Sequence, residues 1–263
     1  MNTMDVIKSR RSVRTFDGRA LRDEDRAALI EYSRSIRNPY DIPVEFAFLD
    51  AAEHGLSSPV IAGEKLYVAG KVAKKAHAEE AFGFSFEKLV LYAWSLGVGT
   101  TWIGGTMNRG QFEKAASLKA GEMMPCVSPL GYPAKKMSVR ETLMRKGVRA
   151  DERKNTAALF FEEDFSTPLT AENESVKAAL EMVRLAPSAV NRQPWRIVRL
   201  GNAYAFYLQH AKGYVSEATG DLQKVDMGIA LCHFMSGIEG ELRLEDPGLS
   251  TEKDTEYIAT VLM

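Results

Sequence analysis

The sequence predicts an α+β protein with a sizeable globular core. The chain has 263 residues, of which 45% are hydrophobic, and this suits one large domain or two small ones. Segments with apolar residues at helical spacing are interspersed with short apolar or alternating segments that favour strands. The order of these segments in the first half of the chain returns, in shortened form, in the second half.

The first half begins with helices and continues with a mixture of strands and helices. Helices are expected at 4–9, 22–37, 86–96 and 109–116. In these segments apolar residues recur at helical spacing, with charged residues between them in several cases. Gly97 is expected to end the third of these helices, because glycine readily adopts the left-handed conformation that follows a helix. Strands are expected at 44–49, 66–69, 97–105 and 124–133. A basic stretch, 135–154, follows the last of them.

The second half repeats the order helix, hairpin, helix and strand. Thr170 is expected to cap a helix from Ala171 to Leu185. Pro187 stops that helix, because proline cannot extend the backbone hydrogen-bond ladder. The remaining segments are a hairpin of 196–200 and 204–208, a helix at 225–238 and a strand at 256–262. We favour an internal duplication, although any α+β protein can show this order twice by coincidence.

Composition excludes several classes of protein. The net charge is −1 and the sequence pI is about 6.5, so no basic excess indicates nucleic acid as a partner. The first residues show no apolar signal region, and no apolar run reaches the roughly 20 residues of a membrane helix. Cys126 and Cys232 lie far apart, so we expect no disulfide framework and a cytoplasmic location. The four histidines show no spacing typical of a zinc or iron site.

Two motifs that lie far apart in the chain are the candidates for a ligand site. The first, 9–16, reads Ser-Arg-Arg-Ser-Val-Arg-Thr-Phe, and the second, 185–195, reads Leu-Ala-Pro-Ser-Ala-Val-Asn-Arg-Gln-Pro-Trp. Arginines suit an anionic ligand, because they form charge-assisted and bidentate hydrogen bonds. In the second motif, small polar side chains follow the end of a helix, and Pro194 predicts an extended Gln193. Singly, the motifs also fit a solvated basic segment and an ordinary turn.

Together the motifs resemble the two halves of the flavin site in the FMN-dependent nitroreductase family. There an Arg-Arg-Ser-x-Arg-x-Phe start and a Pro-Ser-x-x-Asn-x-Gln-Pro-Trp loop flank one FMN, and the resemblance covers nearly the whole chain. It implies a nitroreductase-like fold, with mostly antiparallel sheets wrapped by helices. Because family members are usually homodimers with FMN between the subunits, the repeated pattern implies two family subunits fused into one chain. The expected halves are 1–164, with the phosphate and pyrimidine contacts, and a shortened 165–263, with the Pro-Ser-x-x-Asn loop.

The resemblance assigns roles to individual residues of this chain. Residues of the first motif match the positions that hold the FMN phosphate and pyrimidine edge, and they are Arg10, Arg11, Ser12 and Arg14. Residues of the second motif match positions that cover the ring from the other half, and they are Pro187, Ser188 and Asn191. Arg153 matches a basic residue that returns to the phosphate. Other basic residues compete for this last role, namely Arg140, Arg145, Lys146, Arg149 and Lys154.

A third segment matches the family loop whose backbone approaches N5 and O4 of the flavin. It comprises Ile103, Gly104 and Gly105, and glycine suits such a loop because a side chain would block close approach to the ring. The family's usual acidic residue is replaced here by Gly104. This departure leaves backbone contact with N5 possible but puts the orientation of a substrate in doubt.

The implied activity is that of an FMN-dependent oxidoreductase. NADH or NADPH would donate hydride, and a nitroaromatic, quinone or similar acceptor would receive it from the same ring face. No dedicated catalytic side chain is expected, because the cofactor carries the redox chemistry. The alternatives are a flavin-binding carrier or regulatory module with little turnover, and a degenerate scaffold without flavin. We interpret Cys126, Cys232 and His233 as buried structural residues.

The two halves do not carry equivalent motifs. The segments that would form a mirror site, 36–40 and 165–169, lack the paired arginines and the Ser and Asn in matching places. We therefore expect one FMN per chain and a monomer that serves as a pseudo-dimer, with further oligomerisation left open.

Overall fold

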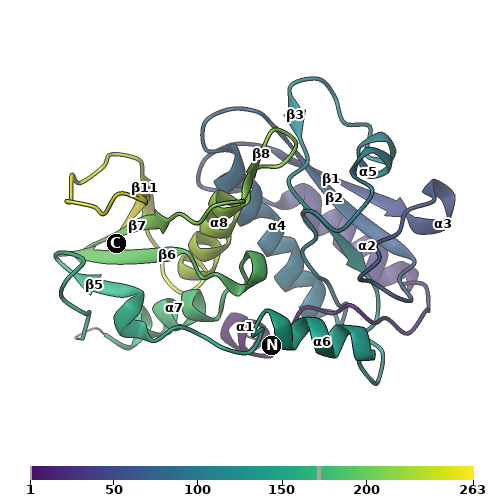
Figure 1. Ribbon diagram of the computed structural model, residues 1–263, viewed down its shortest axis with the longest axis horizontal. Helices are drawn as coiled ribbons and strands as arrows, with labels where there is room; N and C mark the ends of the chain where they lie inside the picture. Colours follow the sequence, from purple (N-terminus) through teal and green to yellow (C-terminus); the bar gives the residue numbers. More distant parts are fainter. Residues whose placement is uncertain (1, 171–172) are drawn as a thin grey trace.

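The computed structural model describes residues 2–170 and 173–263, and it confirms an α+β fold. Two sheets lie on opposite sides of the molecule, and two long helices, α4 (Ala78–Ser95) and α8 (Leu222–Met235), run between them (Figure 1). The other helices are α1 (Thr3–Ser9), α2 (Asp23–Ser35), α3 (Ala51–His54), α5 (Arg109–Ala115), α6 (Val139–Gly147) and α7 (Glu174–Leu185), with 3₁₀ turns η1 (Thr156–Ala158) and η2 (Ala189–Asn191).

The first sheet is antiparallel throughout. Its order is β1 (Val44–Asp50), β2 (Leu66–Ala73) and β3 (Glu122–Met123), and β4 (Val127–Leu130) also pairs with β2. Seven of the eight residues of β2 are buried, because the strand is covered by other strands at both edges and by helix α4 on one face. This sheet and its neighbours form the part of the core nearest the N-terminal motif.

The second sheet has the order β10 (Glu241–Arg243), β11 (Thr255–Leu262), β7 (Ala203–Gln209), β6 (Trp195–Leu200) and β5 (Phe160–Glu162). Only β5 and β6 are parallel. Because β5 comes from the end of the segment 1–164, it joins that segment to the sheet of the second half. A separate small hairpin is formed by β8 (Val215–Ser216) and β9 (Gly220–Asp221).

Helices α4 and α8 touch through their backbones. A Cβ atom at Gly83 would lie 2.1 Å from the carbonyl oxygen of Val225, and one at Gly228 would lie 2.0 Å from that of Glu80. Only glycine permits this approach, since both neighbours are backbone atoms that cannot rotate away. The two glycines therefore allow α4 and α8 to pack closely at the centre of the molecule.

Several boundaries predicted from the sequence are confirmed, and others need correction. Helix α4 begins at Ala78, not at Phe86, and Gly97, with φ of +77°, follows its end as expected. The segment 97–105 is not a continuous strand and forms only isolated bridges. Thr170 does not cap α7: Asn173 does, by accepting a hydrogen bond from the backbone N–H of Val176. The predicted helical residues 171–172 lie outside the described residues.

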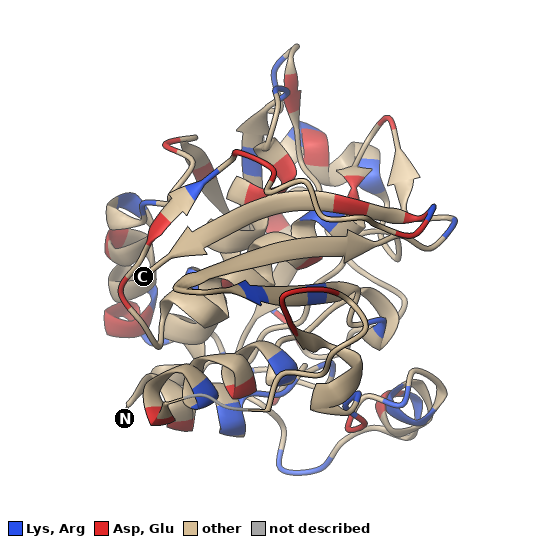
Figure 2. Ribbon diagram, turned by 90° about the vertical axis from the view of Figure 1, so that its left-hand side faces the viewer, with Lys and Arg blue, Asp and Glu red and all other residues tan. Residues whose placement is uncertain are grey.

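Charges of both signs are mixed on the surface. Figure 2, which faces the second sheet, shows Lys and Arg interspersed with Asp and Glu. In the described part of the chain, no helix is both long and apolar enough to cross a membrane.

Candidate functional site

The N-terminal motif is held in place by the first half of the molecule. Helix α1 ends at Ser9, and the following residues run extended beside the segment 99–103. Ser12 forms a parallel bridge with Thr100, and the N–H of Val13 donates to the carbonyl of Thr100 at 2.8 Å. Val13 is fully buried, so this segment is fixed by packing as well as by hydrogen bonds.

Arg10 is a buried cation without a hydrogen-bond partner. Its Nε and Nη1 atoms are inaccessible to solvent and find no acceptor in the described structure. Burial lowers the pKa of Arg10; the charge of Glu87 opposes this effect, and that of Arg145 adds to it. Because desolvation of an unpaired charge is costly, an anion beside this guanidinium would stabilise it.

Arg153 lies within electrostatic reach of Arg10. Its guanidinium donates to the carbonyl oxygens of Ala150 at 2.9 Å and Glu152 at 2.8 Å, but its buried Nε has no partner. Burial lowers the pKa of Arg153, and the positive charge of Arg10 lowers it further. Arg145 acts on both residues in the same direction. Of the basic residues that competed for this place, the structure therefore brings Arg153 and Arg145 to Arg10.

Glu141 on helix α6 faces the other two arginines of the motif. It is 1% exposed and accepts a hydrogen bond from Arg11 Nη1 at 3.3 Å. Burial lowers the pKa of Arg14, and the charge of Glu141 opposes this effect. Arg11 is therefore partly neutralised by the protein, whereas Arg10 Nε and Nη1 have no acceptor among the described residues. No described hydrogen bond engages the hydroxyl of Ser12.

The loop that follows α7 is strained and tied down at several points. Val190, Asn191 and Gln193 have φ values of +42°, +58° and +50°. Gln193 is therefore not extended, contrary to the expectation from Pro194. Conformations of this kind persist only where surrounding contacts enforce them, and they are typical of ligand sites.

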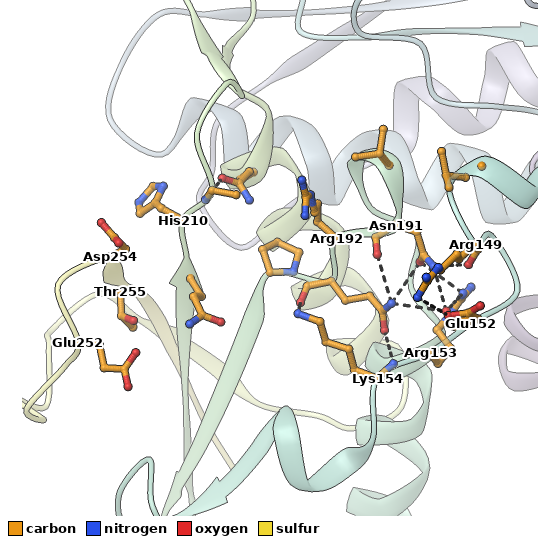
Figure 3. Close-up of a pocket in the computed structure, with 18 of the residues that line it drawn as sticks. Arg149, Glu152, Arg153, Lys154, Asn191, Arg192, His210, Glu252, Asp254 and Thr255 are labelled. Carbon is orange, nitrogen blue, oxygen red and sulfur yellow. Dashed lines mark hydrogen bonds and ion pairs between the residues drawn. The ribbon is translucent and has the colours of Figure 1, made fainter. Parts of the chain in front are cut away.

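Hydrogen bonds hold the loop after α7 in this strained conformation. Ser188 Oγ accepts from the N–H of Gln193 at 2.8 Å, while Asn191 Nδ2 donates to the carbonyls of Arg149 at 2.7 Å and Glu152 at 3.0 Å (Figure 3). Asp226 of α8 accepts from the N–H of Ala189 at 3.0 Å. The polar side chains of Ser188 and Asn191 thus shape the loop itself, and Asn191 Oδ1 also accepts from Arg153 at 3.4 Å. Pro187 begins the loop, one residue after the end of the helix cap.

The Ile103-Gly104-Gly105 segment faces the second half of the molecule. A Cβ atom at Gly104 would lie 3.1 Å from the side chain of Leu222, the first residue of α8, whereas nothing lies within 4 Å of one at Gly105. Arg109 fixes the segment by donating to the carbonyl of Gly104. Ile103 is buried and pairs with Val127. The backbone at Gly105 is therefore open to a ligand.

These contacts connect the predicted residues in one region between the halves. Arg10 is coupled to Arg153, Arg153 bonds Asn191, and Asn191 belongs to the loop that Asp226 holds. Burial raises the pKa of the Cys126 thiol, and Asp226 lies near enough to add to this effect. A Cβ atom at Gly104 would lie 3.4 Å from Cys126 Sγ. Two motifs that are far apart in the sequence thus come to one place.

A pocket of about 1080 Å³ opens on the outer side of the Arg153–Asn191 contact (Figure 3). Its lining includes these two predicted residues but none of the other predicted ones. The segments 147–154 and 190–194 supply more than half of its wall, and the remainder comes from the end of β7, the start of α8 and the segment that leads into β11. The pocket therefore adjoins the candidate site without containing it.

The comparisons with known proteins decide the family. The sequence model of the family described as "Putative TM nitroreductase" matches residues 2–238. The chain belongs to this family. Among solved structures, a putative nitroreductase from Thermotoga maritima has a TM-score of 0.61 and 22% identity, covering 100% of this chain and 94% of its own. A nitroreductase family protein from Clostridium difficile 630 has a TM-score of 0.46 and 16% identity, covering 56% of this chain and 92% of its own.

The likeness to the Thermotoga nitroreductase confirms the nitroreductase fold for this chain. No curated protein matches it. The described residues of this nitroreductase-family chain include no cluster of three or more His, Cys, Asp or Glu that could hold a metal ion. Both cysteines are buried and unpaired, and burial raises the pKa of Cys126 to about 12.

Some residues of the site were not singled out from the sequence of this nitroreductase-family chain. They are Glu87, Arg109, Glu141 and Asp226, and all lie on helices. Glu87, Glu141 and Asp226 are buried and Arg109 is partly buried. On a helix, charged residues ordinarily face solvent, so nothing in the local pattern separates these residues from the rest. A faint signal exists for Glu87 and Asp226, since each is an acidic residue within an otherwise apolar helix.

Proposed function

We propose that this chain binds FMN between its halves and uses it as an oxidoreductase with NADH or NADPH as electron donor. The acceptors we propose are nitroaromatics, quinones or similar compounds. The observation that carries the proposal is Arg10, whose buried Nε and Nη1 atoms lack partners beside two further arginines. Family membership adds to it, because the chain belongs to a nitroreductase family.

A terminal phosphate fits the arginine cluster. Arg10 and Arg153 each leave buried N–H groups unused, and like charges around them disfavour their charged forms. A dianion would reverse both effects, because charge-assisted hydrogen bonds would replace the lost hydration. Arg145 would add a further positive charge, although it already pairs with Asp151.

The flat ring would lie toward the open backbone at Gly105. Ile103 and Gly104 are fixed by Val127 and Arg109, so this surface is rigid before a ligand arrives. The strained loop of Pro187, Ser188 and Asn191 would cover the ring from the second half and exclude water. Bound FMN would supply the two-electron chemistry, while the chain positions donor and acceptor against it.

We further propose that the chain is a fused pair of family-like halves, 1–164 and 165–263. Each half pairs a hairpin, β1–β2 or β6–β7, with a central helix, and each central helix places a glycine at the crossing. The loop before each hairpin is also bonded to its central helix, by Asn38 to Ser85 in one half and by Ala189 to Asp226 in the other. The strand pair, the central helix, the glycine at the helix crossing and the bonded loop thus occur in both halves.

The mirror position offers no phosphate site. The segment 36–40, which would match the Pro-Ser loop, contains Tyr40, and the charge of Glu80 acts on this tyrosine. The buried Oη atom of Tyr40 and the buried Oε2 atom of Glu80 have no hydrogen-bond partner among the described residues. Burial raises the pKa of Glu80 to about 7. A buried acidic group at this position would repel an anion, so we propose a single FMN per chain.

The purified protein is expected to be yellow and to release FMN on heating, because the arginine cluster suits a terminal phosphate. Chromatography of the released flavin distinguishes FMN from FAD and riboflavin. Rapid mixing with NADPH or NADH should then bleach the flavin absorbance quickly. Slow or absent bleaching would favour the second candidate, a flavin-binding carrier with little turnover. The chain makes this candidate credible because Gly104 replaces the family's usual acidic residue. FAD, or no flavin after incubation with FMN, would refute the proposed function.

A further inference from the structure

The floor of the pocket gathers positively charged side chains that form no direct ion pair, although the charge of Glu252 acts on one of them, Arg196. Lys154 and Arg192 line the pocket, and Arg196 lies beside them on strand β6. Within the described residues, none of the three has an Asp or Glu oxygen within the 4.0 Å of an ion pair. This contrasts with Arg149 on the pocket rim, which pairs with Glu152 at 3.6 Å.

The three cations bond only to neutral acceptors. Lys154 Nζ donates to the carbonyl of Gln193 at 3.3 Å, and Arg196 Nη1 donates to the same oxygen at 3.3 Å. Arg192 Nε donates to the hydroxyl of Tyr214 at 3.1 Å. Burial lowers the pKa of Lys154 to about 8, and the charges of Arg196 and Arg192 contribute to this shift. The positive charge of Lys154 is therefore held at a cost that a bound anion would reduce.

This cluster is distinct from the one assigned to FMN. The positive charges that act most strongly on Arg153 are those of Arg10 and Arg184, whereas those that act on Lys154 are Arg196 and Arg192. Neighbouring residues of one extended segment thus serve two different sites. Arg153 and Asn191, which are assigned to the FMN site, lie on the side of the pocket that adjoins it.

The shape of the pocket suits a ligand larger than a simple ion. Its volume of about 1080 Å³ is at the upper end of ordinary small-molecule sites, which span roughly 300–1,000 Å³. Opposite the basic floor, Glu252, Asp254 and Thr255 offer oxygen atoms that can accept hydrogen bonds from hydroxyl or amino groups (Figure 3). A molecule with a phosphate at one end and sugar hydroxyls at the other matches this polarity.

We propose that this pocket binds a phosphate monoester, held by Lys154 and Arg192 with Arg196 behind them. Two sources could supply the group: the 2′-phosphate of NADPH, or a small phosphorylated molecule. The first source would make the pocket an anchor for the electron donor, and that version rests on the proposed function. The second source does not depend on it.

Titration calorimetry with NADP⁺, NAD⁺ and inorganic phosphate tests the proposal, because NADP⁺ and NAD⁺ differ only by the 2′-phosphate. We expect NADP⁺ to bind at least about tenfold more tightly than NAD⁺, the effect of one charge-assisted contact. Lys154→Gln should abolish this advantage. Lys253→Gln, the same change at an exposed position of the same pocket, should preserve it. Arg192→Gln, at an exposed side chain that folding does not require, should weaken it as well.

The titrations with the three ligands distinguish NADPH from a small phosphorylated molecule as the source of the phosphate. Equal binding of NADP⁺ and NAD⁺, with binding of inorganic phosphate that Lys154→Gln and Arg192→Gln weaken, would assign the site to a small phosphorylated molecule. Absence of any phosphate-dependent binding, or binding unchanged in both variants, would overturn the proposal. Flavin absorbance, measured on the same samples, should be unaffected by Lys154→Gln. Loss of flavin from the wild-type protein would count against the proposed function and leave this test intact.

Discussion

Glu87→Ala is expected to lower the free energy of unfolding by about 3–5 kcal/mol, the effect of removing one partner from a buried charged network. Glu87 and His233 are both fully buried, and Glu87 Oε1 lies 2.9 Å from His233 Nε2. Glu87 Oε2 accepts from Trp102 Nε1 at 3.1 Å. The alanine variant would leave both nitrogen atoms buried without an acceptor or donor. Chemical denaturation followed by circular dichroism measures the loss.

Glu87→Gln is the matched control for this experiment. The carbonyl of Met182 can only accept, so His233 Nδ1, at 2.8 Å, carries a proton in both proteins. When an amide replaces the Glu87 carboxylate, the ring can be neutral and its Nε2 can be left without a proton. A glutamine can then accept from Trp102 with its oxygen and donate to the free His233 Nε2 with its amide. We expect a loss below about 1.5 kcal/mol, the scale of a single net hydrogen bond. Equal stability of the alanine and glutamine variants would show that this network does not hold α4 and α8 together.

Gly228→Ala is expected to destabilise the protein by about 2–3 kcal/mol, because it overpacks a helix crossing. The added Cβ would lie 2.0 Å from the carbonyl oxygen of Glu80 and 2.8 Å from the N atom of Phe84. The helices would have to separate, since backbone atoms of α4 cannot turn aside. This cost exceeds the gain of about 1 kcal/mol that alanine brings to a helix interior.

Gly110→Ala provides the contrast, since Gly110 also lies in a helix, α5, but in open surroundings. The nearest atom to its added Cβ is Asn108 Oδ1 at 3.9 Å, an ordinary contact distance. We expect this variant to be as stable as the wild type or up to about 1 kcal/mol more stable. A Gly228→Ala protein with the same unfolding midpoint would refute the close backbone contact between α4 and α8.

Helices and strands were predicted correctly where their own residues carry the signal, such as a turn residue or an apolar face. The hairpin around Gly201 follows from a turn residue between two apolar strands, and Gly201 indeed has φ of +64°. Helix α7 has a clear apolar face, and its end before Pro187 was predicted. In both cases the signal lies within the segment itself.

Elements that depend on tertiary contacts were harder to predict. Apart from Glu79 and Glu80, the first two turns of α4 carry no charged residue, because they are buried on almost all sides against α8 and the first sheet. Strand β5 has three residues and exists because β6 pairs with it in parallel. Its sequence alone gives no such indication. The segment 97–105 has strand-like composition, yet its neighbours bond it only at isolated residues.

For the candidate site, the motifs predicted which residues belong together but not how each is used. Arg10 and Arg153 were expected near one phosphate, and the structure gives both of them unused N–H groups. Asn191 was expected to face a ligand, whereas its amide mainly holds Arg149 and Glu152 in place. Sequence motifs identify positions, but the hydrogen bonds of a loop depend on the segments folded against it.

The central claim is that one FMN lies between the halves, on the arginine cluster of the first half. Isothermal titration of the flavin-free protein with FMN measures both the ratio and the affinity. We predict one FMN per chain, and binding that Arg10→Ala weakens by roughly ten- to hundredfold, as for the loss of a charge-assisted hydrogen bond. Arg26→Ala, at an exposed position of α2, should leave the affinity unchanged. Two FMN per chain, one FMN shared by two chains, or an Arg10→Ala protein with wild-type affinity would contradict the account.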